Sequence, residues 1–111
     1  MLTQSYTAVV ERNQVWSGAF ATEPYEAAWA HEAIFFIRVL EARNLDRLNV
    51  YVQISPDGMH WCDEGTHLSL PVEAEQVVFC RVAHFGGWLR LHGTLPEGAE
   101  LRVIVYLSLK A

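Results

Sequence analysis

The side chains best suited to metal chemistry lie in one short stretch. His60, Cys62 and His67 supply imidazole and thiol groups, with Asp63 and Glu64 between them. In an extended strand His60 and Cys62 leave the same face, and His67 can return from the next strand as a third ligand. The spacing matches no standard zinc module, and structural zinc sites use four ligands. We therefore predict a polar hairpin with no metal or other cofactor; His60, Cys62 and His67 remain the alternative metal ligands.

Nucleophilic catalysis needs a serine or cysteine beside a base that a third group orients. Cys62, Cys80 and five histidines supply the residue types, but no local signature such as Gly-x-Ser-x-Gly or His-Glu-x-x-His occurs, and no glycine-rich phosphate loop follows a strand. Cys80 ends the apolar run Val77-Val78-Phe79-Cys80 and is expected to be a small buried hydrophobic residue. We predict no catalytic residues and a protein that is not an enzyme. An enzyme subunit or small hydrolase is the weakest alternative.

Charge and composition exclude several classes of partner. The 13 acidic residues outnumber the 8 lysines and arginines, for a net charge of −5, and no stretch clusters basic residues. Nucleic acids and anionic membranes are therefore not expected as partners. The N-terminus shows no signal peptide pattern, and no segment approaches the roughly 18 apolar residues of a membrane helix. We expect a protein of the cytoplasm or of a particle. Without a secretory signal, Cys62 and Cys80 are expected as free thiols, with one disulfide as the alternative.

The backbone that must position these groups is predicted from hydrophobic periodicity. Apolar and polar residues alternate with period two in residues 48–55 and 101–110, as half-buried strands require. The side chains expected to face the core are Leu48, Val50, Val52, Ile54, Leu101, Val103, Val105, Leu107 and Leu109. The run from Ile34 to Leu40 is almost continuously apolar. Such a run is typical of a strand covered on both faces.

Weaker patterns bring the expected total to seven or eight strands. They cover residues 6–11, 15–21, 66–70, 76–82 and 88–93. Turn residues separate them at Pro56-Asp57-Gly58, Gly86-Gly87 and Leu95-Pro96-Glu97-Gly98. Many short strands with such turns favour a sandwich or barrel, and we predict an all-β, antiparallel two-sheet sandwich. Residues 23–33 are the one helical candidate, a short helix near 24–33, with a loop as the alternative. At 111 residues, the chain has room for a single domain, residues 1–111.

Two motifs carry a resemblance to known domains. Ser55-Pro56-Asp57-Gly58-Met59-His60-Trp61 is typical of a hairpin with glycine at positive φ and a tryptophan that covers the hydrophobic layer. Phe85-Gly86-Gly87-Trp88-Leu89-Arg90-Leu91 then begins another strand. The pair resembles the Ser-x-Asp-Gly-x-x-Trp hairpin and aromatic-x-Arg strand of discoidin, or coagulation-factor C-type, galactose-binding jelly rolls. It is more similar still to short phage-virion and bacterial surface sandwich domains. The resemblance covers residues 48–91 and implies a jelly-roll-like fold with a non-catalytic role.

The residues of the hairpin motif are expected to be structural. Asp57 can accept hydrogen bonds from the backbone amides of the turn that begins at Ser55, Gly58 meets the positive φ, and Trp61 packs. A candidate contact face is expected on the polar side of the alternating strands, because binding surfaces favour aromatic and arginine side chains. Its residues are Tyr51, Gln53, Trp88, Arg90, His92, Arg102 and Tyr106. The alternative is that some of these side chains only cover the edge of the second sheet.

Two functions compete on these observations. The chain is 51% hydrophobic with four Trp, four Tyr and five Phe, more apolar surface than one small core hides, so a homo-oligomer is expected. The leading hypothesis is a structural assembly or decoration protein that oligomerises and docks on a larger particle such as a virion, shell or surface layer. Residues 1–20 would then serve as an arm or an exchanged strand. The alternative is a carbohydrate-binding module of galactose-binding-like type.

Overall fold

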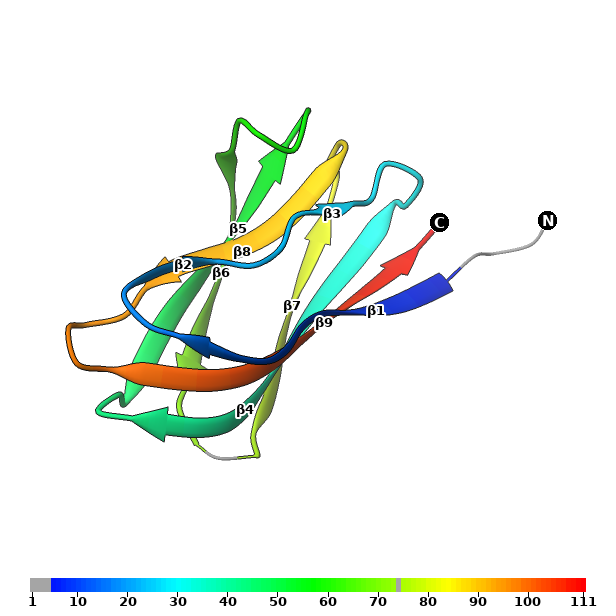
Figure 1. The fold of residues 1–111 in the computed structure, drawn as a ribbon. Coiled ribbons are helices and arrows are strands. Elements are labelled where there is room, and N and C mark those ends of the chain that lie inside the picture. Colours follow the sequence, from blue (N-terminus) through cyan, green and yellow to red (C-terminus); the bar gives the residue numbers. More distant parts are fainter. Residues whose placement is uncertain (1–4, 74) are drawn as a thin grey trace.

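The chain folds into two stacked antiparallel β-sheets. The computed structural model describes residues 5–73 and 75–111, and within them every regular element is a strand (Figure 1). The nine strands of these described residues are β1 (Ser5–Trp16), β2 (Ala19–Ala21), β3 (Tyr25–Glu26), β4 (Glu32–Arg43), β5 (Arg47–Ser55), β6 (Cys62–Pro71), β7 (Val77–Ala83), β8 (Trp88–Thr94) and β9 (Glu100–Lys110). The predicted all-β two-sheet sandwich is confirmed, with nine strands instead of seven or eight. No helix in the described part of the chain is long and apolar enough to cross a membrane.

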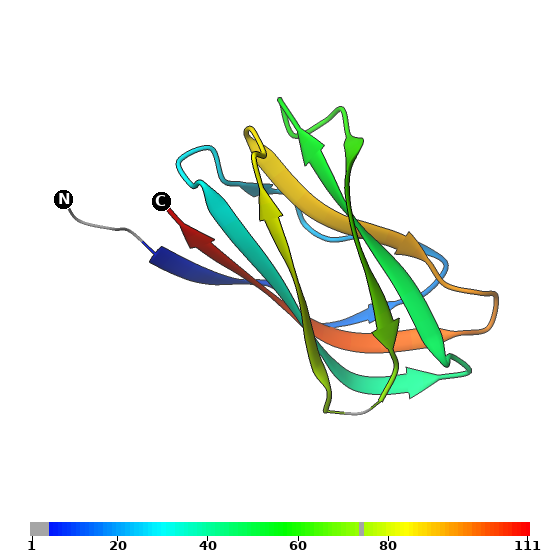
Figure 2. The same cartoon turned by 180° about the vertical axis from the view of Figure 1, so that it is seen from behind.

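The order of the strands defines the fold class. One sheet has the order β1-β9-β4-β7, and the other has the order β2-β8-β5-β6 with β3 also paired to β8. Strands from the first half of the chain therefore pair with strands from the second half in nested fashion: β1 with β9, β2 and β3 with β8, β4 with β7, and β5 with β6. This nested pairing, rolled into two layers as the rear view shows (Figure 2), is that of a double-sheet jelly roll.

The core lies between the sheets and follows the alternation of the sequence. Every second residue of β9, from Leu101 to Leu109, is fully buried, and Leu48, Val50 and Val52 of β5 are buried opposite them. Cys80 is 8% exposed and faces the same core, as expected. The alternation of β5 ends at Ile54, which is only partly buried, because the turn that follows covers Ser55 instead.

The N-terminal part differs from the prediction in where its strands end. β1 runs without interruption through the expected gap after Glu11, because Asn13 adopts a positive φ of 54° in a bulge and pairing with β9 resumes at Gln14. The true break is at Gly18, also at positive φ, where the chain leaves one sheet and β2 joins the other. Residues 5–16 pair with β9 of their own chain. Residues 1–4 of the predicted arm lie outside the described residues, and strand exchange between subunits stays a prediction.

Two further segments are residues 23–33, for which a helix and a loop were both predicted, and residues 34–40, for which the prediction was wrong. Residues 23–33 contain the short strand β3 and a loop rather than a helix, held by the bond from Ala27 N to Gly87 O (2.7 Å) and by burial of Ala27 and Ala30. The run from Ile34 to Leu40 lies in β4 and was predicted to be covered on both faces. That prediction is wrong for the single chain: Phe35, Ile37 and Val39 are buried, whereas the alternate side chains stay partly exposed on the outside of the sheet.

Candidate functional surfaces

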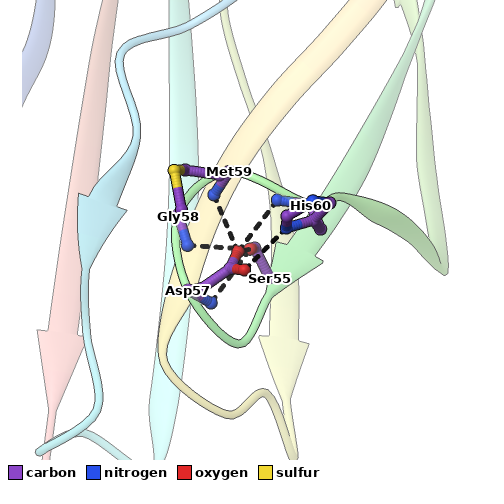
Figure 3. Close-up of polar contacts among 5 residues, drawn as sticks. All are labelled: Ser55, Asp57, Gly58, Met59 and His60. Carbon is purple, nitrogen blue, oxygen red and sulfur yellow. Dashed lines mark hydrogen bonds and ion pairs between the residues drawn. The ribbon is translucent and has the colours of Figure 1, made fainter.

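The turn between β5 and β6 is held by a local hydrogen-bond network (Figure 3). Asp57 Oδ1 accepts from the backbone N–H groups of Met59 (2.8 Å) and His60 (2.9 Å), and its Oδ2 lies 2.7 Å from His60 Nδ1. Ser55 Oγ accepts from the N–H groups of Gly58 (2.8 Å) and Asp57 (3.2 Å). The bonds from the His60 backbone and ring, and from Met59 N, hold the pKa of Asp57 far below its usual range. All these partners lie within the turn, so Ser55, Asp57 and Gly58 shape it.

The turn also covers Trp88 at the start of β8. A Cβ atom built on Gly58, which has a φ of +79°, would lie 3.1 Å from the Trp88 ring. This close approach leaves the ring only partly exposed. Trp88 is therefore placed beside the turn, at one end of the candidate contact face.

The hairpin motif predicts that Trp61 covers the core, but in the structure Trp61 does not. It lies on the outside of the five-stranded sheet, where the guanidinium of Arg90 sits 4.2 Å from the centre of its ring. The strand that returns from the turn begins at Cys62, and Trp61 precedes it without reaching the layer between the sheets. Its packing partner is a cation, which favours the electron-rich face of an indole ring.

A continuous strip of polar and aromatic side chains covers the outer side of β6, β5 and β8; we call it the polar-aromatic face. Its members are Tyr51, Gln53, Trp61, Asp63, His67, Arg90 and His92. The register aligns two rows across three strands: His67, Tyr51 and His92 in one, and Asp63, Gln53 and Arg90 in the other.

The members of the polar-aromatic face bond mainly to one another. Arg90 Nε donates to Gln53 Oε1 (2.7 Å), and Gln53 Nε2 donates to Asp63 Oδ1 (3.2 Å), which also lies 2.9 Å from His92 Nε2. The Tyr51 ring lies 5.6 Å from the His92 ring and 6.0 Å from that of His67. Partial burial lowers the pKa of Arg90. The strip can present aromatic faces and oriented polar atoms to a flat ligand.

The predicted contact face is divided between the two sheets. Tyr51, Gln53, Trp88, Arg90 and His92 share the outside of the five-stranded sheet, but Arg102 and Tyr106 lie on the outside of the other sheet, where β9 pairs with β4. Asp63, His67 and Trp61 were missed as members. The sequence could have indicated Asp63 and His67, because residues separated by an even number of positions lie on the same face of a strand.

The alternative metal ligands do not come together. His60 bonds to Asp57, His67 lies against Tyr51, and Cys62 Sγ donates to the carbonyl of Ile54 at 3.7 Å. Among the described residues, no group of three or more His, Cys, Asp or Glu side chains could hold a metal ion. Cys62 and Cys80 are both free thiols. Burial, with a smaller contribution from Glu64, raises the pKa of Cys80 to about 11.

The outer side of the four-stranded sheet is a second surface, and it was missed by sequence reasoning; we call it the apolar face. One row crosses all four strands: Val9 on β1 pairs with Tyr106 on β9, Tyr106 with Phe36 on β4, and Phe36 with Phe79 on β7. On either side lie two further rows, Ile104, Arg38 and Val77 in one, and Thr7, Ser108, Ile34 and Arg81 in the other. The side chains of Val77, Phe79 and Val9 are 55%, 46% and 39% exposed.

A shallow depression of about 370 Å³ adjoins the polar-aromatic face. The residues that line it include Tyr51, His92, Arg47, Asn49 and Thr94. Tyr51 and His92 both belong to the predicted contact face, so this hollow adjoins that face.

Comparisons with known proteins agree with the fold class that the strand order defines, the double-sheet jelly roll. No protein-family model and no curated protein matches the sequence. Among solved structures, one chain in the structure of infectious bursal disease virus, Gx strain, superposes with a TM-score of 0.58 at 10% sequence identity. The match covers 97% of this chain and 32% of that one, so this chain spans about a third of that chain's length. At such low identity the likeness shows the fold alone. The resemblance to discoidin domains stays a prediction.

Proposed function

We propose that the chain is a non-catalytic structural protein that docks on a larger particle, such as a virion, shell or surface layer. The apolar face carries this proposal. When one side of an antiparallel sheet packs on the core and the other faces water, the outer side is normally polar. Here an unbroken row from Val9 to Phe79 crosses the whole width of the sheet with apolar and aromatic side chains. A contiguous exposed patch of this kind is typical of a protein–protein contact.

The fold class supports the same proposal by analogy. Double-sheet jelly rolls are frequent among viral capsid and lectin domains, and the similar chain named above comes from the structure of a virus. A fold alone does not assign a function, so this support is secondary to the composition of the apolar face.

The cysteines also favour a role without covalent catalysis. Cys80 is buried, and a pKa raised to about 11 keeps its sulfur as the unreactive thiol near neutral pH. Cys62 is exposed, and its Sγ lies against the backbone carbonyl of Ile54 rather than beside a base. Neither arrangement provides the nucleophile–base pair that covalent catalysis requires.

Co-sedimentation with particles from the source of the protein tests the proposal. We expect the wild-type chain to sediment with particles in a density gradient and to be visible on them by immunogold electron microscopy. Phe79→Ser should reduce this association, while Met59→Ser, which changes a side chain 74% exposed on the β5–β6 turn, should not. A wild-type chain that stays at the top of the gradient with every particle fraction would overturn the proposal.

Binding of a carbohydrate by the polar-aromatic face is the second candidate function. Tyr51 is 39% exposed beside the 370 Å³ depression, and Asp63, Gln53 and Arg90 are already oriented by mutual hydrogen bonds. Aromatic rings stack on sugar faces while such polar groups bond hydroxyls.

A glycan array together with tryptophan fluorescence tests the carbohydrate hypothesis. Because Trp61 lies in this face, a bound sugar should change the emission, and Tyr51→Ala should abolish the change. Tyr6→Ala, at a tyrosine 55% exposed on β1, is the matched control. A silent array and constant fluorescence would eliminate carbohydrate binding.

A further inference from the structure

We propose that the apolar face packs against the same face of a second copy of the chain, forming a two-fold homodimer of stacked sheets. The inference rests on the proposed function in taking the apolar face as an assembly surface, and it assigns a second copy as the protein that covers this face. Phe79→Ser would then weaken docking on a particle by breaking the dimer. Three observations support a second copy: the extent of the face, its charge, and the arrangement of its rows.

The hydrophobic material is concentrated at the middle of the face. The rings of Phe36 and Phe79 lie 6.1 Å apart and are tilted by 43°, and Tyr106 is the cross-strand neighbour of Phe36 on its other side. The exposed ends of this row, Val9 and Phe79, lie on the two edge strands. A covering protein must therefore span all four strands to remove the row from water. A single helix, about 10 Å wide, would leave part of the row uncovered.

The dimensions of the face match those of a stable dimer interface. Four strands at about 4.8 Å spacing are about 19 Å wide, and strands of 7 to 12 residues at about 3.3 Å per residue are roughly 23–40 Å long. Each copy can thus contribute about 600 Å², for about 1,200 Å² in total, at the lower end of specific, stable interfaces. A second copy has the width and length to cover the face completely.

The charge distribution favours contact through this face. The three central rows contain two charged side chains, Arg38 and Arg81, and Arg38 bonds to Glu75 at 2.8 Å. Together these three residues carry a charge of +1, which leaves −6 for the rest of a chain whose net charge is −5. A contact through the apolar face therefore keeps most of the negative charge of each copy away from the interface.

The arrangement of the rows is self-complementary. A two-fold axis parallel to the central row places that row against itself and reverses the strand direction, so Phe79 of one copy meets Phe79 of the other. The same operation brings Arg81, at one end of β7, toward Glu75 just before the other end of β7 in the second copy. An isologous contact of this kind satisfies the closed symmetry of most homo-oligomers, with sheets about 10 Å apart.

Mass measurement by light scattering or equilibrium sedimentation tests the dimer. We expect the wild-type protein at twice its chain mass of 12.6 kDa. Phe79→Ser and the milder Val77→Thr should weaken the dimer, the first by about tenfold or more, without changing the circular dichroism spectrum. Tyr51→Ser, at an aromatic side chain of similar exposure on the opposite sheet (39% against 46% for Phe79), is the matched control and should leave the mass unchanged.

A crosslink tests the position of the two-fold axis. In a Cys62→Ser background, Phe79→Cys should give a disulfide-linked dimer on mild oxidation, while Tyr51→Cys should not.

A chain that stays monomeric at its highest soluble concentration, or a dimer that Tyr51→Ser disrupts and Phe79→Ser does not, would overturn the inference. If the wild-type chain is monomeric but Phe79→Ser still abolishes binding to particles, the dimer is wrong and the proposed function stands. If the wild-type chain is a dimer that binds no particle, the inferred dimer stands and the proposed function is wrong.

Discussion

Gly93 in β8 is the position where one added methyl group should disturb the sandwich most clearly. A Cβ atom there would lie 2.9 Å from the carbonyl oxygen of Asn49 in β5 and 2.9 Å from two ring carbons of Phe20 in β2. The Phe20 ring is itself stacked on Trp16 with centroids 3.9 Å apart. Gly93 therefore leaves the space that the Phe20 ring occupies where β2 pairs with β8. Gly93→Ala tests this packing directly.

The expected cost follows from the two obstacles. Contacts below 3.0 Å require one of the neighbours to move, and the Asn49 oxygen belongs to the backbone of a central strand. Overfilled cores typically lose about 1–3 kcal/mol. Replacing glycine by alanine regains about 0.4–1 kcal/mol through the unfolded chain. Taking the middle of each range, we expect a net destabilisation of about 1.3 kcal/mol, which is a decrease of roughly 0.7–1.3 M in the urea midpoint at a slope of about 1–2 kcal/mol per M.

Urea unfolding followed by tryptophan fluorescence is the assay, with Gly86→Ala as the control. A Cβ at Gly86 meets nothing within 4 Å, so this variant should be neutral or slightly more stable. Combining Gly93→Ala with Phe20→Leu should cost less than the sum of the single changes, because the smaller side chain relieves one of the two contacts. Equal midpoints for Gly93→Ala and the wild type would refute the packing of Phe20 over β8.

Three further predictions concern the turn and the core. Asp57→Asn should destabilise the chain at neutral pH, and because the pKa of Asp57 is lowered on folding, the difference from wild type should shrink in acid denaturation as the pH falls below about 4. In the folded chain at pH 8, iodoacetamide should modify Cys62 but hardly Cys80, whose pKa is raised to about 11, while both should react in urea; equal rates in the folded state would contradict the burial of Cys80. Leu107→Ala, at a fully buried side chain, should cost about 2–5 kcal/mol in chemical unfolding, against less than about 0.5 kcal/mol for Ser108→Ala on the outer side.

The elements that the sequence predicts best are those with one face in the core. β9 has an apolar residue at every second position from Leu101 to Leu109, and these are the residues that are buried. The division between β1 and β2 was misplaced for a physical reason. A bulge such as that at Asn13 interrupts the period of two in the same way as the end of a strand, and a true crossing between sheets needs only the short bend at Gly18.

The prediction of the candidate surfaces from sequence alternation is limited in a related way. Alternation correctly predicts that Arg90 and Tyr106 point away from the core, but it does not say to which sheet each strand belongs. That depends on pairing between distant segments, β8 with β5 and β9 with β4. Residues predicted as one contact face therefore lie on opposite sides of the sandwich, and the row containing Phe36 and Phe79 emerges only from the register.

The two outer faces differ in what they still require from a partner. On the polar-aromatic face, Asp63 and Gln53 are bonded to neighbours on adjacent strands, and Arg90 also packs on Trp61. A ligand there must compete with bonds that already exist. On the apolar face, the Arg81 guanidinium lies 5.0 Å from the centre of the Phe79 ring, but Val77 and Phe79 stay 55% and 46% exposed. The free energy of their contact with water falls only when another surface covers them. Hence β4 combines a buried face toward the core with a second, partly exposed apolar face, which the proposed dimer would cover.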